Sequence, residues 1–197
     1  MILADRDIKK ALKAGRITIE PLFPNAIQPA SVDLHLGADF LVFRTDKHVC
    51  IDPKEPLDHM MESVTINENR QFVIHSGQFA LGMTYEITGV ADDMVARLEG
   101  KSSLGRIGLI IHATAGYLDP GNKLKMTLEL HNVSSLPIKL YYKMPIAQMS
   151  FTPLSSKAER PYGHKKGNHK YFGDMKPSPS KFYKNFEKGK DAWRRFK

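Results

Sequence analysis

The chain has 197 residues, 42% of them hydrophobic and 25% charged, and its formal net charge is +8. This length predicts one domain with a single core and a smaller appendage, and no apolar run approaches the roughly 18 residues that a membrane span requires. Cys50 is the only cysteine. It excludes an internal disulfide and, with an N-terminus that lacks an apolar signal core, leads us to expect a mature protein of the reducing cytoplasm.

The positive charge is concentrated at the C-terminal end. Residues 157–197 contain 13 Lys or Arg against 4 Asp or Glu, a net charge of +9, whereas residues 1–156 contain 16 against 17, a net charge of −1. A basic tail with aromatic residues can bind a polynucleotide, close over a polyphosphate or remain a solvated end. Because residues 1–156 carry no basic stripe, we expect no nucleic-acid partner.

The chain begins with a predicted helix over residues 5–15, with Asp5 as its N-cap, Ile8 and Leu12 on one side, and Gly15 at its end. Short extended segments follow at residues 16–20, 31–36, 40–43, 65–66, 71–74, 79–82, 94–98, 109–112, 125–130, 138–142 and 147–151. About ten such strands without alternating helices predict an all-β sandwich or jelly-roll barrel and argue against an α/β sheet. We assign the barrel to residues 1–156 and a separate basic tail to residues 157–197.

Residues 100–106, GKSSLGR, are the first candidate for a ligand-binding loop. They do not form a P-loop, because such a loop needs a glycine five residues before Gly100, and Val95 stands there. The lysine, the two serines and the arginine nevertheless suit the recognition of oxyanions. The alternative is a polar turn between two strands.

The predicted strand at 125–130 carries a second candidate. Its alternation places Met126, Leu128 and Leu130 on one face and Lys125, Thr127 and Glu129 on the other. If the polar face points into a cleft, Glu129 is a desolvated carboxylate that can act as a general base. If that face points to solvent, Glu129 is an ordinary surface residue.

Two further polar residues have structural interpretations. Asp119 in LDPG is expected to form a turn, and His112 is expected to be a hydrogen-bonded structural histidine. The histidines form no HxH, HxxxH or HExxH pair, and one cysteine cannot supply the ligand set of a zinc deaminase. We therefore expect no metal site formed by the protein alone.

The order of these motifs resembles the dCTP deaminases, a family related to the trimeric dUTPases. The matching segments are MILADRDI from residue 1, QPASVDLHLG (28–37), GKSSLGR (100–106), HATAGYLDPG (112–121), TLEL (127–130), PIAQMSF (145–151), RPYG (160–163) and KYFG (170–173). The resemblance implies a distorted jelly-roll or β-barrel of the dUTPase type, with a short N-terminal helix and a flexible C-terminal tail that closes over the active site. It also implies a homotrimer with shared active sites.

The resemblance further implies zinc-independent hydrolysis of dCTP at C4 of cytosine. Glu129 would be the base that activates water, Ser102 and Arg106 would position that water and stabilise charge, and Asp119 would contact the deoxyribose. Residues 101–106 would bind phosphates, with a neighbouring subunit completing the site. The other nucleotide-binding positions implied are Lys101, Ser103, Leu104, Gly105, Ala115, Thr127, Leu128, Gln148, Tyr162 and Lys170. Mg²⁺ is expected to arrive with the triphosphate rather than in a protein cage.

The pair Gly116-Tyr117 bears on the product. Family members that release dUTP typically carry His-Arg there, whereas bifunctional members carry Gly and an aromatic residue and also cleave the triphosphate, giving dUMP, pyrophosphate and ammonia for dTMP synthesis. Gly116 would leave room for a water near the α-phosphate, and Asp119 would orient that water. The alternatives are a monofunctional deaminase that releases dUTP, a dUTPase, or a catalytically silent nucleotide-binding trimer.

Three segments depart from the family pattern. Residues 122–125, NKLK, stand where an aromatic residue and a glycine are usual, and Asp174 stands where the tail usually offers a glutamine. An aspartate near a triphosphate repels it unless a cation intervenes. Residues 183–197 have no counterpart that we can match.

Overall fold

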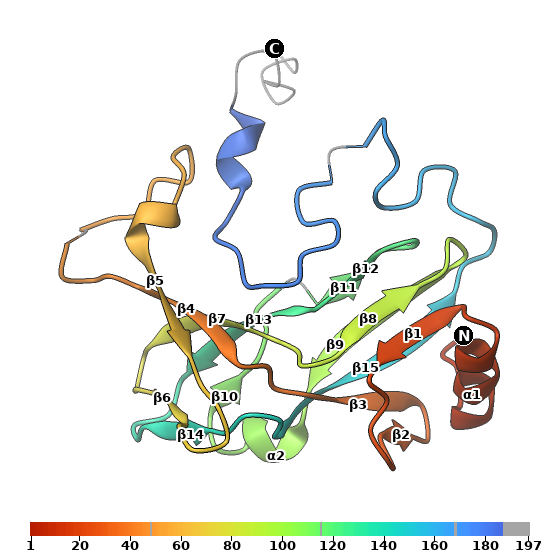
Figure 1. Ribbon diagram of the computed structural model, residues 1–197, viewed down its shortest axis with the longest axis horizontal. Coiled ribbons are helices and arrows are strands. Elements are labelled where there is room, and N and C mark those ends of the chain that lie inside the picture. The colour runs from red at the N-terminus through yellow and green to blue at the C-terminus, as the bar shows by residue number, and fades with distance from the viewer. Residues whose placement is uncertain (48, 115, 168, 187–197) are drawn as a thin grey trace.

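The computed structural model describes residues 1–47, 49–114, 116–167 and 169–186, and short antiparallel strands make up most of it (Figure 1). The strands are β1 Ile17–Glu20, β2 Ile27–Gln28, β3 Ser31–His35, β4 Asp39–Phe43, β5 Met61–Thr65, β6 Phe72–Ile74, β7 Phe79–Met83, β8 Ile87–Val90, β9 Met94–Gly100, β10 Leu109–Ile110, β11 Tyr117–Leu118, β12 Lys123–Leu124, β13 Thr127–Asn132, β14 Ile138–Leu140 and β15 Pro145–Pro153. The helices are α1 Asp5–Lys13 and α2 Ser102–Gly105, with 3₁₀ turns η1 Asp58–Met60 and η2 Phe182–Asn185. The predicted all-β class is confirmed.

Hydrogen bonds join these strands into four sheets. Two have five strands, in the orders β10-β13-β7-β4-β5 and β11-β9-β15-β3-β2; a third is β1-β8-β12, and β14 pairs with β6. One hydrophobic cluster contains buried side chains from both large sheets, among them Leu130 of β13, Leu34 of β3 and Phe151 of β15. Each such side chain contributes about 1.5–3 kcal/mol on burial. Because successive residues of a strand point to opposite faces, this burial directs the intervening polar residues away from the core.

Several strands differ from the expectation. Strands β2, β8, β11 and β12 were not predicted. Three of them have only two residues, and β8 contains Gly89, which weakens the apolar pattern of a strand. β13 begins at Thr127 rather than Lys125, whose N–H donates to the carbonyl oxygen of Asp174 in the tail (3.0 Å). β10 ends at Ile110, so that His112 lies outside it.

Helix α1 lies beside β1 (Figure 1) and buries Ile8 and Ala11. The prediction of Asp5 as N-cap is wrong: Ala4 is the N-cap and makes no side-chain hydrogen bond, and the N–H of Asp5 already donates to the carbonyl oxygen of Pro29 (2.9 Å). The predicted end at Gly15 is confirmed by its φ of 69°, in the left-handed region that glycine adopts at little cost.

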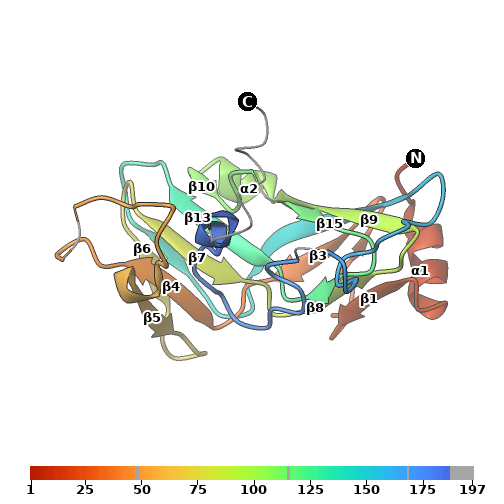
Figure 2. The ribbon, with the colours of Figure 1, turned by 90° about the horizontal axis from the view of Figure 1, so that it is seen from above.

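The tail runs back across the body after β15. Figures 1 and 2 show it passing over β11 and β12 and then placing η2 above β7 and β13. Its described part is held by direct contacts: the N–H of Tyr162 donates to the carbonyl oxygen of Pro120 (2.8 Å), and the ammonium of Lys54 lies 5.6 Å from the ring centre of Phe186. Residues 187–197 are outside the described part of the chain.

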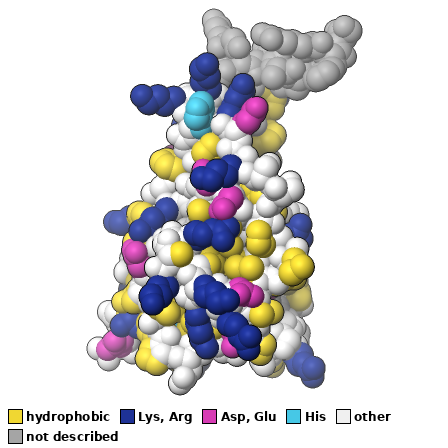
Figure 3. All heavy atoms as spheres, turned by 90° about the vertical axis from the view of Figure 1, so that its right-hand side faces the viewer, with side chains coloured by type: hydrophobic (Ala, Val, Ile, Leu, Met, Phe, Trp, Pro, Cys, Tyr) yellow, Lys and Arg dark blue, Asp and Glu magenta, His cyan; other side chains and the backbone are white. Residues whose placement is uncertain are grey.

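Basic side chains gather on the face that carries α1, with acidic side chains among them (Figure 3). Several are paired: Lys10 with Asp7 (3.3 Å), and Arg16 with Asp93 (2.8 Å). Within the described residues, no helix has the length and hydropathy needed to cross a membrane.

Candidate active site

A cavity of about 540 Å³ opens between β13, the β11–β12 segment and the tail. Its apolar lining consists of Phe43, Leu57, Met61, Phe79, Leu81, Leu118, Leu124 and Met126, and its polar lining consists of Tyr117, Asp119, Asn122, Lys125, Thr127, Glu129, Tyr162, Tyr171, Asp174, Ser178 and Ser180. A cavity that combines apolar side chains with converging polar groups is typical of a small-molecule site.

Glu129 projects into this cavity from the middle of β13. Its neighbours Leu128 and Leu130 are fully buried, so alternation directs the half-buried Glu129 and Thr127 to the cavity side. The carboxylate is held from the segment after β10: its Oε2 accepts the N–H of Ala113 (2.9 Å) and, at longer range, that of Thr114 (3.4 Å). Of the two interpretations left open for Glu129, the structure supports the cleft.

Asp119, which directly follows β11, and Tyr162, in the tail, line the same cavity. Burial raises the pKa of Asp119, and the nearby His169 acts in the opposite direction. Burial also raises the pKa of Tyr162, whose hydroxyl accepts the N–H of Tyr171 (3.4 Å). Tyr162 therefore keeps its proton at neutral pH and remains a hydrogen-bond donor for an anionic ligand.

The predicted phosphate-binding segment, residues 101–106, lies outside the cavity that contains Glu129. Ser102, Ser103 and Arg106 are exposed on and just after α2, and none of them lines the cavity. Gly105 and Arg106 instead border a separate cleft of about 830 Å³. A single chain thus brings Glu129, Thr127, Asp119, Tyr117 and Tyr162 together but does not bring Ser102 and Arg106 to them.

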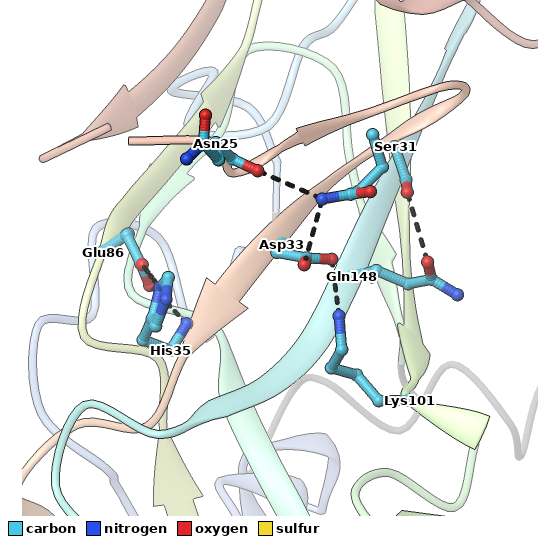
Figure 4. Close-up of polar contacts among 8 residues, drawn as sticks. Asn25, Ser31, Asp33, His35, Glu86, Lys101 and Gln148 are labelled. Atoms are coloured by element: carbon cyan, nitrogen blue, oxygen red, sulfur yellow. Dashed lines mark hydrogen bonds and ion pairs between the residues drawn. The ribbon is translucent and has the colours of Figure 1, made fainter. Parts of the chain in front are cut away.

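Lys101 and Gln148 form a second cluster, beside α2 (Figure 4). The ammonium of Lys101 lies 2.7 Å from the carboxylate of Asp33, and the hydroxyl of Ser31 donates to the side-chain oxygen of Gln148 (3.2 Å). The pairing of β15 with β3 places Gln148 opposite Asp33, and the pairing of β15 with β9 places Gln148 opposite Glu99, two residues before Lys101. Ser31 and Asp33 were not predicted as site residues, although both lie on one face of the alternating segment 31–36.

Figure 4 also shows a buried pair at the far end of β3. Nδ1 of His35 lies 2.5 Å from Oε1 of Glu86, and the backbone N–H of His35 donates to Oε2 (2.9 Å). The Glu86 side chain is only 1% exposed, and the ring of His35 stacks on Phe23 at 4.2 Å. This pair fixes the turn between β7 and β8 to β3.

Gly116 was expected to leave room for a water near the α-phosphate, but its surroundings give a different reason for a glycine at this position. An ideal Cβ at this position would lie 2.7 Å from the carbonyl oxygen of Leu98 and 2.9 Å from Cε1 of His112. Glycine is therefore needed here for close backbone packing, and Gly116 also lines a small separate cavity of about 200 Å³. Among the described atoms, Nδ1 of His112 is buried without a hydrogen-bond partner, so the hydrogen bond predicted for this histidine is not formed at Nδ1. Ala115 is outside the described residues.

Of the predicted site residues Tyr117 and Lys170, only Tyr117 lines the cavity. Tyr117 is 47% exposed, lines the cavity and lies 5.6 Å from the guanidinium of Arg97. Lys170 does not line the cavity; its ammonium donates to the side-chain oxygen of Asn185 (2.7 Å) and lies over the ring of Phe182. The described residues contain no group of three or more His, Cys, Asp or Glu side chains placed to hold a metal ion.

Sequence comparisons agree on one family. A family model described as dCTP deaminase-like matches residues 2–154. A protein of Nocardia farcinica named "dCTP deaminase, dUMP-forming" is 47% identical over 192 residues, which cover 98% of this chain and 96% of that protein. A protein of the same name from Methanothermobacter thermautotrophicus is 45% identical over 190 residues, covering 94% of this chain and 96% of that protein.

A solved structure shares the fold. The 2'-deoxycytidine 5'-triphosphate deaminase of Agrobacterium tumefaciens superposes with a TM-score of 0.60 and 23% identity. The match covers 76% of this chain and 47% of that one, so this chain spans about half the length of the Agrobacterium protein. The predicted fold class is confirmed by this likeness.

Proposed function

The chain belongs to the dCTP deaminase-like family, and we propose that it hydrolyses dCTP to dUMP, pyrophosphate and ammonia. The observation that supports this most directly is the Glu129 carboxylate in the wall of the partly apolar cavity, oriented by the N–H of Ala113. The name "dCTP deaminase, dUMP-forming" of relatives about 47% identical over nearly the full length supports the same substrate and product.

Glu129 acts as the proton carrier of the deamination. It accepts a proton from water as the oxygen adds to C4 of cytosine and passes that proton to N3 of the ring. It then carries the proton of the new hydroxyl to the amino group, so that ammonia leaves and a carbonyl forms at C4. The apolar lining limits the access of other water molecules to these steps.

Asp119 serves the second hydrolysis. A water oriented by its carboxylate attacks the α-phosphorus, and the bond to the oxygen bridging the α- and β-phosphates breaks, which leaves dUMP and releases pyrophosphate. Tyr162, protonated at neutral pH, donates a hydrogen bond to the phosphates. Thr127 and the backbone of β13 contact the base, and Asp119 also contacts the deoxyribose.

A neighbouring subunit completes the site in a homotrimer. Ser102 and Arg106 are exposed on and just after α2 and do not line the cavity of Glu129 in the same chain. The apolar side chains Ile107, Leu136 and Tyr141, which border the same cleft as Arg106, are 50%, 72% and 54% exposed. Such a surface is suited to contact with another copy. In the assembly, α2 of one copy supplies Ser102 and Arg106 to the cavity of the next, with Lys101 and Gln148 on the phosphates.

Mg²⁺ accompanies the triphosphate in this proposal. The ion keeps several waters and binds phosphate oxygens together with one or two carboxylates, and Asp119 lies in the wall of the cavity. When bound, Mg²⁺ neutralises phosphate charge. We place the enzyme in the cytoplasm, where dCTP is available.

The test is the product of dCTP incubated with the purified protein and Mg²⁺, separated by anion-exchange chromatography. Release of dUMP and pyrophosphate is expected. Accumulation of dUTP would retain the deaminase and remove the second hydrolysis. Unchanged dCTP would contradict the enzymatic proposal and favour a nucleotide-binding protein, and turnover of dUTP alone would identify a dUTPase.

A further inference from the structure

Lys181 closes residues 170–181 of the tail into a loop over the cavity. Its ammonium lies 3.2 and 3.1 Å from the two carboxylate oxygens of Asp174 and donates to the carbonyl oxygen of Lys170 (3.0 Å). The same ammonium lies 5.0 Å from the ring centre of Tyr171, and the backbone N–H of Lys181 donates to the Tyr171 hydroxyl (2.9 Å). Lys181 is therefore held in one position beside Asp174.

Asp174 forms part of the cavity wall. Its Oδ2 also accepts the hydroxyl of Ser178 (2.7 Å), and its carbonyl oxygen accepts the N–H of Lys125 at the start of the β13 segment (3.0 Å). The side chains of Asp174 and Lys181 are 19% and 25% exposed. Water screens charges less at such partly buried positions than at the surface, so an unpaired charge on Asp174 would strongly repel an anionic ligand in the cavity.

The three carboxylates of the cavity wall differ in their partners. Glu129 accepts backbone N–H groups and Asp119 lies near His169, whereas among the described residues Asp174 is the one of the three with a lysine ion pair. Glu129 and Asp119 need accessible carboxylates for the proposed chemistry. Asp174 has no chemical role there, and an uncompensated negative charge would repel the phosphates.

We propose that Lys181 determines the affinity of the cavity for the triphosphate by neutralising Asp174. This inference rests on the proposed function, since the anion that it concerns is the triphosphate of dCTP. It makes Lys181 a positioning and specificity residue rather than a catalytic one. It also makes the effect of Lys181 depend on the charge of the ligand.

The test compares Lys181→Met, Asp174→Asn and the double variant by equilibrium binding of dCTP and of dCMP. We expect Lys181→Met to raise the Kd for dCTP about tenfold, because it leaves a carboxylate unpaired near several phosphate charges, and to raise the Kd for dCMP less than about threefold. In the double variant no carboxylate remains at position 174, so dCTP affinity returns to within about threefold of the parent. Lys176→Met, which removes an exposed lysine of the same loop, controls for net charge.

The outcomes of this test separate the charge of Asp174 from other roles of Lys181. If the double variant binds dCTP as weakly as Lys181→Met, Lys181 acts only by holding the loop. If dCTP and dCMP lose affinity equally, the charge of Asp174 is not the cause. A parent protein that neither binds nor deaminates dCTP would overturn the proposed function together with this inference, whereas an active parent with an unaffected Lys181→Met variant would overturn the inference alone.

Discussion

The ammonium of Lys101 lies 2.7 Å from the Asp33 carboxylate, as a close ion pair without the alignment of a hydrogen bond. A triphosphate bound by Lys101 must share this ammonium with Asp33. We therefore expect Asp33→Asn, which keeps the shape of the side chain, to lower the KM for dCTP about threefold, and Lys101→Met to raise it about tenfold. Steady-state kinetics at fixed ionic strength measure both. A change of both variants in the same direction would show that Asp33 supports Lys101 rather than competing for it.

Glu129→Gln is expected to abolish deamination while nucleotide binding remains. The amide keeps an oxygen that can accept the N–H of Ala113 but cannot carry a proton, so kcat should fall about 100-fold or more with the Kd for dCTP within about threefold of the parent. The measurements are product formation and equilibrium binding of dCTP. Glu62→Gln, an exposed glutamate on β5, is the matched control. Retained turnover in Glu129→Gln would assign the base to another residue.

Gly116→Ala is expected to affect stability and product together. The added methyl group would meet the carbonyl oxygen of Leu98 at 2.7 Å, while the N–H of Leu98 is bonded to the carbonyl oxygen of Gly116 (2.7 Å). We expect a loss of about 1–3 kcal/mol in the free energy of unfolding and a shift from dUMP toward dUTP as the adjoining Tyr117 and Asp119 move.

The control for Gly116 is Gly105→Ala. An ideal Cβ at Gly105 meets no described atom within 4 Å, and alanine in α2 should change the free energy of unfolding by no more than about 1 kcal/mol. Denaturant unfolding of both variants provides the comparison. Equal stability of the two variants, with dUMP still formed, would remove the role of Gly116.

The raised pKa of Asp119, caused by burial, predicts an acid limit for dUMP formation. The second hydrolysis needs the ionised carboxylate, so it should fail as pH decreases at a higher pH than is usual for an aspartate. Product ratios of dUTP to dUMP across acidic pH measure this. A ratio that does not depend on pH would mean that Asp119 does not orient the water.

The same shift has a consequence for stability. A folded-state pKa above the unfolded value means that ionised Asp119 disfavours the fold above its folded pKa and has no effect below the unfolded one. Asp119→Asn should therefore raise Tm at neutral pH, and the difference should shrink toward acid pH. Thermal unfolding at several pH values, with exposed Asp46→Asn as control, tests this without any substrate.

Alternation predicted the strands that bury several apolar residues in succession. Val32 and Leu34 on β3, and Leu128 and Leu130 on β13, repeat with a period of two, and both strands lie where the pattern places them within two residues. The two-residue strands have too few residues for any period. They exist because a neighbouring strand already offers hydrogen bonds, as β9 does for β11, which is a long-range cause.

Only the part of the site that depends on local alternation was predictable from the sequence. The position of Glu129 beside buried leucines follows from local alternation, but whether its face meets a cavity depends on the tail and on β11. Asp33 is 68 residues from Lys101 in the chain, and the two meet because β15 pairs with β3 on one side and with β9, which ends just before Lys101, on the other. Asp174 and Lys181 lie in a loop without periodicity, where the sequence indicates charge but not pairing.

The separation of Ser102 and Arg106 from Glu129 within one chain predicts complementation between inactive subunits. Ser102→Ala lacks one half of each shared site and Glu129→Gln lacks the other, so each homotrimer should be inactive. After unfolding and refolding as an equal mixture, random assembly unites an intact Glu129 with an intact Ser102 from the next subunit in about one quarter of the sites. Recovery of about 25% of parent activity in the mixture, and none in either variant refolded alone, would establish shared sites. No recovery, with both variants shown to be in the same mixed trimers, would mean that α2 reaches Glu129 of its own chain by a rearrangement.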